Sequence, residues 1–405
     1  MYDLKLRFIL LLAAVFFTLA AGCSTSPSPV KPPKTLVKIE NDFSVNRQWQ
    51  FQIGEGASDN YLRLTPVIDD DIFYSVDYLG TVVAIRISDR DLLWKTETGL
   101  AGGSPLTVKG DALYFGTSEG YLISLDKKTG KLIWKAKVGS EVLAAPAVGG
   151  GHVVARCVNG EIYTFNAFDG KKIWTNGQIT PSLTLRGTSA PVISNDLVLS
   201  AFDNGKLVAY NLQTGRIIWQ KTISVARGRT SLERLVDIDA DIVIADDIVY
   251  TVAFQGKLAA VSLASGQVLW SRDISSYIGM AVDPYRIYIV DSDSQLWALD
   301  KSNGATLWKQ DAMLRRSTTK PMLHSNYVVL GDFNGYLHWF RRDTGKLAAR
   351  VRLNSYDYTD PDLDEEEDLE YPKSRDILAT PITHGNLLIA VDRHGNTEAF
   401  DVSYP

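Results

Sequence analysis

The chain has 405 residues, of which 45% are hydrophobic, 10% aromatic and 22% charged. This balance is typical of a globular protein and excludes disorder of the whole chain. The formal net charge is −5, which argues against nucleic acid as the main partner, because phosphate binding needs a basic face. The two cysteines, Cys23 and Cys157, are too few for a disulfide framework or a cysteine-ligated zinc site.

The first 22 residues have the pattern of a bacterial signal peptide. Two basic residues precede an apolar run over 8–21, which is shorter than the ~20 residues that a membrane-spanning helix needs. The run ends in LAAGC at 19–23. This ending resembles the lipobox of bacterial lipoproteins, which are cut before the cysteine and carry lipids on it. We therefore predict a signal peptide over 1–22 and lipidation of Cys23. The alternative is an ordinary secretory signal with an incidental cysteine.

A polar segment follows the predicted cleavage site. Residues 24–35 read STSPSPVKPPKT, and this richness in Pro and Ser predicts a flexible, lipidated tether over 23–43. Ser24 follows the cysteine where an Asp would favour the inner membrane. By the resemblance to bacterial lipoproteins, this implies an outer-membrane protein that is lipid-anchored and faces the periplasm. Several acyl chains would make the attachment stable, at about 0.8 kcal/mol per buried methylene.

The rest of the chain, 44–405, repeats one unit of about 40 residues. The clearest copy, 104–134, contains four short strand patterns separated by turns. Four short strands per repeat are the unit of a β-propeller. We therefore predict an all-β fold, an eight-bladed β-propeller with four antiparallel strands per blade. Seven of the nine tryptophans fall on the last strand of a copy: Trp49, Trp94, Trp134, Trp174, Trp219, Trp270 and Trp308.

Closure of the ring is also predictable. The last copy ends near Val402 after only three strands, and the missing fourth strand, with its tryptophan, stands at 46–51. We therefore predict that the N-terminal strand pairs into the last blade, which leaves no free end. In the seventh copy, Ala349 occupies the tryptophan position. We expect looser packing between that blade and the next.

The segments 125–134 (LDKKTGKLIW) and 210–219 (YNLQTGRIIW) resemble the tryptophan-docking repeat of quinoprotein dehydrogenases. The resemblance implies that each indole wedges between two blades. Those enzymes use adjacent cysteines, a calcium ion held by carboxylates and an amide, and a catalytic Asp. This chain has no adjacent cysteines and no recurring carboxylate constellation, so we expect no cofactor and no enzymatic activity. A quinone- or sugar-binding envelope enzyme and a generic ligand-binding propeller are the alternatives.

Three further segments, PSLTLRG at 181–187, RLVDID at 234–239 and GYLHW at 335–339, are similar to the BamB family. These are lipoproteins of the bacterial outer-membrane β-barrel assembly machinery. The resemblance covers essentially the whole mature chain. It implies a non-enzymatic scaffold that binds the POTRA region of BamA, and through it the rest of the Bam complex. Such a scaffold helps barrel proteins to fold and insert, either by orienting the POTRA region or by contacting nascent chains directly.

The loops between blades carry what differs from copy to copy. The connections after the third and fourth copies are 5 and 11 residues longer than the shortest ones, which places two insertions on one rim. The first displays Leu183, Leu185 and Arg186, and the second displays Asp237 and Asp239. The family resemblance implies that these five residues form the BamA-binding surface. The alternative is that the leucines turn inward while Arg186 pairs with one of the aspartates.

A third insertion, at about 355–373, is acidic. Nine of the 14 residues in 357–370 are Asp or Glu. Three of them alternate like the start of a calcium loop, but Glu365 stands where that loop needs glycine. The five histidines show no metal-ligand spacing either. We therefore predict a solvated acidic loop and no metal site, with weak divalent-cation binding as the alternative.

Overall fold

The computed structural model describes residues 31–403 except 188, 227 and 354–375. In this part of the chain all 32 regular elements are β-strands. No helix in it is long and apolar enough to cross a membrane. The predicted signal peptide, the predicted lipidation site Cys23 and the acidic insertion lie outside the described residues.

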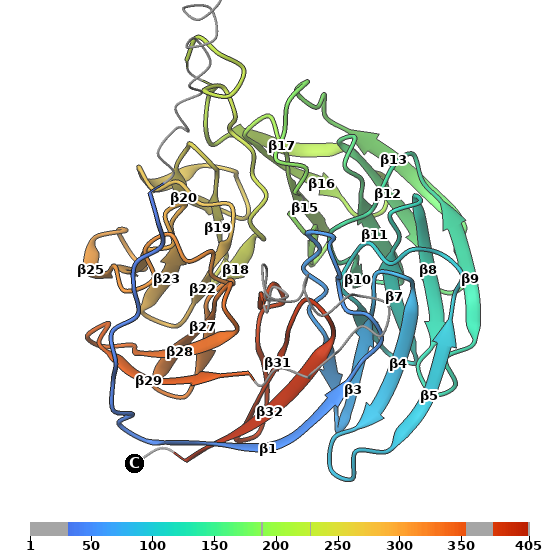
Figure 1. Cartoon of the computed structure of the whole chain (residues 1–405). Helices are drawn as coiled ribbons and strands as arrows, with labels where there is room; N and C mark the ends of the chain where they lie inside the picture. Colours follow the sequence, from blue (N-terminus) through green and yellow to red (C-terminus); the bar gives the residue numbers. More distant parts are fainter. Residues whose placement is uncertain (1–30, 188, 227, 354–375, 404–405) are drawn as a thin grey trace, which may run out of the picture. The chain divides into compact units, whose positions relative to one another are not determined.

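The strands form eight four-stranded antiparallel sheets, the blades, arranged in a ring (Figure 1). Blades 1 and 2 consist of β2 (Val67–Asp69), β3 (Ile72–Val76), β4 (Thr81–Arg86), β5 (Leu92–Glu97), β6 (Thr107–Lys109), β7 (Ala112–Gly116), β8 (Tyr121–Asp126) and β9 (Leu132–Lys137). Blades 3 and 4 consist of β10 (Ala147–Gly149), β11 (His152–Arg156), β12 (Glu161–Asn166), β13 (Lys172–Gly177), β14 (Val192–Ser194), β15 (Leu197–Ala201), β16 (Lys206–Asn211) and β17 (Ile217–Thr222).

Blades 5 and 6 consist of β18 (Val243–Ala245), β19 (Ile248–Val252), β20 (Leu258–Ser262), β21 (Val268–Arg272), β22 (Gly279–Val282), β23 (Arg286–Val290), β24 (Leu296–Asp300) and β25 (Thr306–Gln310). Blades 7 and 8 consist of β26 (Met322–His324), β27 (Tyr327–Gly331), β28 (Tyr336–Arg341), β29 (Leu347–Arg352), β30 (Ile382–His384), β31 (Leu387–Val391), β32 (Asn396–Ser403) and the N-terminal strand β1 (Ser44–Gln52).

The predicted eight-bladed architecture is confirmed, including its closure. Blade 8 has the order β1-β32-β31-β30, so its outermost strand comes from the start of the chain. Trp49 on β1 pairs with Ala399 on β32, the same register that the tryptophans have in the other blades. Joining the first strand to the last buries what would otherwise be an open sheet edge.

Size complementarity inside each blade explains where the tryptophans stand. In seven blades a small residue on the third strand pairs with the tryptophan on the fourth, as Ser124 does with Trp134. The bulge next to this pair, where Leu125 pairs with Leu132, adds a residue to the outer strand. Blade 7 reverses the two sizes, because Trp339 on β28 pairs with Ala349 on β29.

The expectation of looser packing after blade 7 is wrong, because the indole has moved to the neighbouring strand. Trp339 is completely buried in a core cluster that blades 7 and 8 share. The ring of Phe43 packs edge-on against it, with 6.3 Å between centroids. This arrangement leaves the buried indole N–H of Trp339 without a hydrogen-bond partner in the described part of the chain, which is unfavourable.

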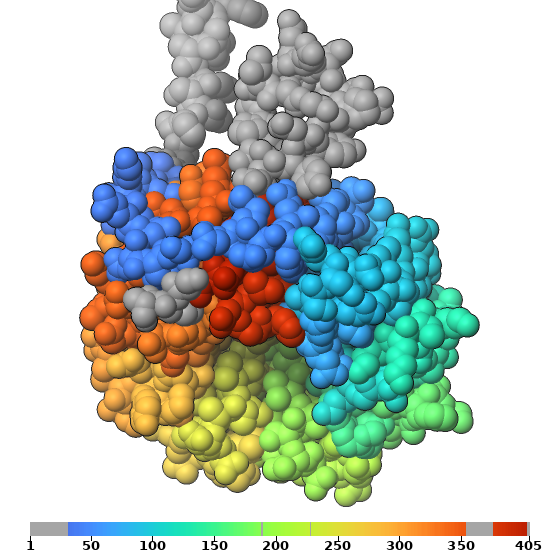
Figure 2. Space-filling view, turned by 90° about the horizontal axis from the view of Figure 1, so that it is seen from below, coloured from blue at the N-terminus to red at the C-terminus, as the bar shows by residue number. Residues whose placement is uncertain are grey.

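The flexible tether predicted for 23–43 does not extend to its C-terminal half. The compact unit begins at Lys34, whose backbone N–H donates to Leu314 and whose ammonium group pairs with Asp311 at 2.7 Å. Phe43 is buried. Figure 2 shows this N-terminal segment in blue, crossing the orange and red strands of the last blades. Specific contacts therefore tie residues 34–43 to the propeller, and the Pro- and Ser-rich composition is confined to the residues before them.

Candidate functional site

Two long loops on one rim make up the candidate site. The first, 178–191, connects β13 to β14, and the second, 223–242, connects β17 to β18. Both lead from the outermost strand of one blade to the innermost strand of the next. The backbone N–H of Leu185 in the first loop donates to Oδ2 of Asp237 in the second, at 2.5 Å. The insertions predicted to share a rim are therefore in direct contact.

The first loop presents apolar side chains beside a cation. The side chains of Leu183 and Leu185 are 43% and 40% exposed. Arg186 is exposed too, and its Nη2 lies 2.7 Å from Oε1 of Glu141 in the loop after β9. Hydrogen bonds from Ser140 and then from Arg186 lower the pKa of Glu141. The leucines therefore do not turn inward, and the partner of Arg186 is Glu141 instead of either predicted aspartate.

The two aspartates lie beneath the first loop. Asp237 is fully buried and Asp239 is 6% exposed, so neither presents its carboxylate to a partner. Gly187 rests directly on Asp239, because a Cβ at this glycine would lie 2.6 Å from the Cγ of Asp239. The aspartates thus support the backbone over 185–187. We predicted that the aspartates share the exposed surface with the leucines. In the structure they are buried and support the loop that carries the leucines.

These carboxylates belong to a buried polar cluster. Arg156 on β11 forms an ion pair of 2.5 Å with Asp203, and both side chains are buried. Burial, and then the charge of Asp203, raise the pKa of Asp237 to about 6, although the Leu185 N–H opposes the shift. Burial, followed by the charges of Asp203 and Asp237, raises the pKa of Asp239 to about 7. Neither oxygen of Asp239 has a hydrogen-bond partner among the described residues, which agrees with a carboxyl that resists ionisation.

Sequence reasoning missed three exposed apolar residues of the same two loops. Ile179 is 90% exposed, and Val225 and Leu232 are 65% and 64% exposed. The side chain of Asn204 donates to the carbonyl of Ile179 at 3.2 Å and so ties this part of the first loop to blade 4. The sequence could have indicated them, because each is an apolar residue within the extra loop length that the other repeats lack. Clustered exposed apolar side chains with a polar rim are typical of protein-binding surfaces.

Outside this cluster, the described residues also hold a buried network of Asp332, His338 and Arg316 around blade 7, but no metal site. None of their His, Cys, Asp and Glu side chains form a group of three or more that could hold a metal ion. Cys157 is buried and free, and burial raises the pKa of its thiol to about 11, which suits a core residue better than a nucleophile. The fold and the rim together define a class: a β-propeller whose distinguishing feature is an exposed, partly apolar surface built from two long loops.

Comparisons with known proteins identify the family. The family model described as "Outer membrane protein assembly factor BamB" matches residues 79–310. A protein of that name from Yersinia pestis is 33% identical over 98% of this chain and all of the relative. One from Kangiella koreensis is 37% identical over 84% of this chain and 88% of the relative. The chain therefore belongs to the BamB family.

Solved structures agree at the level of the fold. The crystal structure of BamB from Moraxella catarrhalis superimposes with a TM-score of 0.76 at 20% identity, covering 88% of this chain and all of that one. A quinohemoprotein alcohol dehydrogenase from Comamonas testosteroni also superimposes, with a TM-score of 0.69 at 12% identity, covering 91% of this chain and 78% of that one. At these identities both comparisons establish the propeller and no activity.

Proposed function

We propose that this chain is a non-enzymatic scaffold lipoprotein of the outer-membrane protein assembly complex. It binds the POTRA region of BamA and assists the folding and insertion of β-barrel proteins. A lipid on Cys23 anchors it in the outer membrane, facing the periplasm. One observation carries the proposal: a chain of the BamB family exposes Leu183, Leu185 and Arg186 on a braced rim loop.

The geometry suggests that some residues of this surface contact the partner and others hold the loop in place. Leu183 and Leu185 are the apolar anchors that a pocket on the partner would cover, while Arg186 sets their orientation. Asp237 and Asp239 act as positioning residues, because they hold the loop without reaching its surface. A loop that is already ordered loses less conformational freedom on binding, which favours affinity.

A closed ring favours the orienting role over direct capture of nascent chains. Each blade has two edge strands, and the innermost one lies against the innermost strands of neighbouring blades, so the outermost strand keeps the unpaired edge that faces outward. An extended client could therefore add only at the periphery of the propeller. We infer that the main contribution is to hold the POTRA region in a productive orientation.

The test is co-purification with BamA from membranes that contain the lipidated protein. Leu185→Ala combined with Arg186→Ala should abolish co-purification while leaving the thermal transition nearly unchanged. A matched control, Leu132→Ala with Lys131→Ala, removes an exposed leucine and a cation from blade 2 and should leave BamA binding intact. Normal recovery of BamA with the rim variant, or an equal loss with the control, would overturn the proposed face.

The second candidate, a quinone-dependent enzyme, rests on the fold shared with quinohemoprotein alcohol dehydrogenases. The absorbance spectrum of the purified protein, with and without added quinone and calcium, separates the two candidates. A scaffold leaves the quinone spectrum unchanged. A stoichiometric, calcium-dependent spectral change would favour the enzyme.

A further inference from the structure

Six of the eight junctions between blades are sealed in the same way. The indole N–H of each tryptophan donates to a backbone carbonyl in the next blade, at 2.7–3.2 Å. A glycine with positive φ lies against each indole face, as Gly130 does against Trp94. A Cβ at any of these glycines would lie only 2.5–2.8 Å from the indole. Glycine is therefore required wherever an indole seals the junction.

The junction between blades 8 and 1, where the ring closes, breaks this rule. Arg90 occupies the glycine position of the turn with a φ of 68°, and the turn is otherwise the same, since its N–H donates to the Arg86 carbonyl. The indole N–H of Trp49 has no hydrogen-bond partner among the described residues. Trp49 instead stacks on Phe51, with ring centroids 4.7 Å apart and planes 16° apart.

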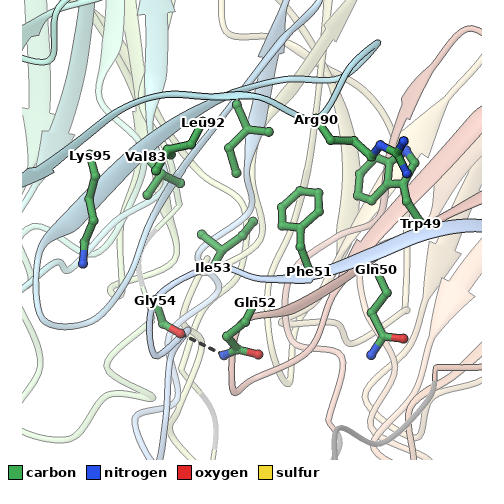
Figure 3. Close-up of a pocket in the computed structure, with 11 residues that line it drawn as sticks. Trp49, Gln50, Phe51, Gln52, Ile53, Gly54, Val83, Arg90, Leu92 and Lys95 are labelled. Carbon is green, nitrogen blue, oxygen red and sulfur yellow. Dashed lines mark hydrogen bonds between the residues drawn. The ribbon is translucent and has the colours of Figure 1, made fainter.

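Phe51 departs from the repeat as well. At the corresponding position four other blades carry a polar side chain that donates to the glycine carbonyl of the next blade, such as Thr96 at 2.9 Å and Asn176 at 3.0 Å. With neither the glycine nor this polar contact, the junction is left with a cavity of about 470 Å³ between β1 and β5. Figure 3 shows Trp49, Phe51 and Ile53 on one wall, facing Val83 and Leu92 on the other.

The cavity combines an apolar floor with a cationic rim. Its apolar lining comes from Trp49, Phe51, Ile53, Val83, Ile85 and Leu92. Arg90 stands at the rim beside Trp49 (Figure 3) and forms no ion pair among the described residues, while Lys95 pairs only with the exposed Glu97. An apolar or aromatic group that carries a carboxylate beside it would match both features.

The strand that forms one wall argues for a peptide. Among the described strands, β1 pairs with β32 alone, so its outer backbone edge is available to pair with an extended chain. An acyl chain would leave those N–H and C=O groups without partners. We propose that the groove between blades 8 and 1 binds an extended segment of a partner protein in which an aromatic and an acidic residue stand two positions apart, so that both side chains project from the same face. The aromatic ring occupies the cavity, and the carboxylate pairs with Arg90.

The experiment uses the mature chain with Cys23→Ser, and a fluorescein-labelled octapeptide in which Thr alternates with Phe and Asp replaces one central Phe, two positions from its neighbouring Phe. Fluorescence anisotropy should show saturable binding. Replacing the peptide's Asp by Asn, or introducing Arg90→Gln, should each weaken binding about tenfold, the effect of losing one charge-assisted hydrogen bond. Lys131→Gln, which removes a cation from the equivalent turn of blade 2, should leave binding unchanged.

A second variant separates binding from folding. Arg90→Gly restores the residue of the six sealed junctions, so that Trp49 can dock and fill the cavity. It should abolish saturable peptide binding while raising the melting temperature. Absence of saturable binding to the wild-type chain, or wild-type binding by Arg90→Gly, overturns the proposal.

The same experiments would also show whether the groove is occupied by the chain's own acidic segment or by a second copy of the chain. If only a variant lacking 355–373 binds the peptide, the chain's own acidic segment occupies the groove. If the wild-type chain dimerises in sedimentation and Arg90→Gly does not, a second copy occupies it. Either result overturns a partner protein as the occupant.

Discussion

The buried carboxyl of Asp239 provides the most quantitative test of how the rim loop is supported. Its pKa is raised from 3.8 to about 7 by burial and by the neighbouring charges of Asp203 and Asp237. Below pH 4 the carboxyl is protonated in both the folded and the unfolded chain. Between pH 4 and pH 7 only the folded chain keeps the proton. The stability that this proton contributes is therefore fully present below pH 4 and is lost as the pH rises through 7.

The size of the effect follows from the two pKa values. From pH 5 up to its folded-state pKa of about 7, Asp239 is protonated only in the folded chain, an interval of about two pH units. At 1.36 kcal/mol per unit this lowers the free energy of unfolding by about 3 kcal/mol. Asp239→Asn has no proton to lose at this site. Relative to the wild type, its free energy of unfolding should therefore rise by about 3 kcal/mol on going from pH 5 to pH 8.

Urea unfolding of the mature chain at the two pH values measures this difference directly. Asp293→Asn, which replaces an exposed carboxylate of blade 6, should follow the wild-type pH dependence. If Asp239→Asn and the wild type lose the same stability between pH 5 and pH 8, Asp239 is not a buried support. It would then be open to solvent, and the account of the loop would have to change.

The anchor and the blade junctions give further predictions. Cys23→Ser should release the protein from membranes into the soluble periplasmic fraction, and continued sedimentation with membranes would refute lipidation. Trp219→Ala should lower the free energy of unfolding by about 3–5 kcal/mol, because the indole is buried and donates to Leu263 at 2.9 Å. Trp49→Ala should cost less than half as much, because this indole is only partly buried and has no hydrogen-bond partner among the described residues. Urea titrations that give equal losses would contradict the difference between sealed and open junctions.

The fold was predictable because its signal is local and repeated. Each tryptophan and each turn glycine recurs at a fixed place in a short unit, and the strand at 46–51 is recognisable as the piece that the last copy lacks. The tryptophan missing from blade 7 was harder to interpret. Trp339 replaces it from the adjacent strand, and only the cross-strand register reveals that the two positions face each other.

The sequence predicted which residues belong to the candidate site. It did not predict which of them are exposed and which are buried supports. Leu183, Leu185 and Arg186 stand out because they lie in extra loop length. The burial of Asp237 and Asp239 depends on how loops from different blades meet, and sequence spacing does not report that contact. Arg90 is a different case. Its place in a turn that elsewhere contains glycine is visible in the sequence, but its consequence appears only when Trp49 is seen undocked.

The most direct test of the proposed surface is photocrosslinking in intact cells, with a photoreactive amino acid in place of Leu183. Because this side chain is an exposed anchor of the rim, the account predicts a crosslink to the POTRA region of BamA. The same substitution at Leu132, which is exposed on blade 2, should give none. A crosslink to BamA from the Leu132 position and none from the Leu183 position would contradict the account.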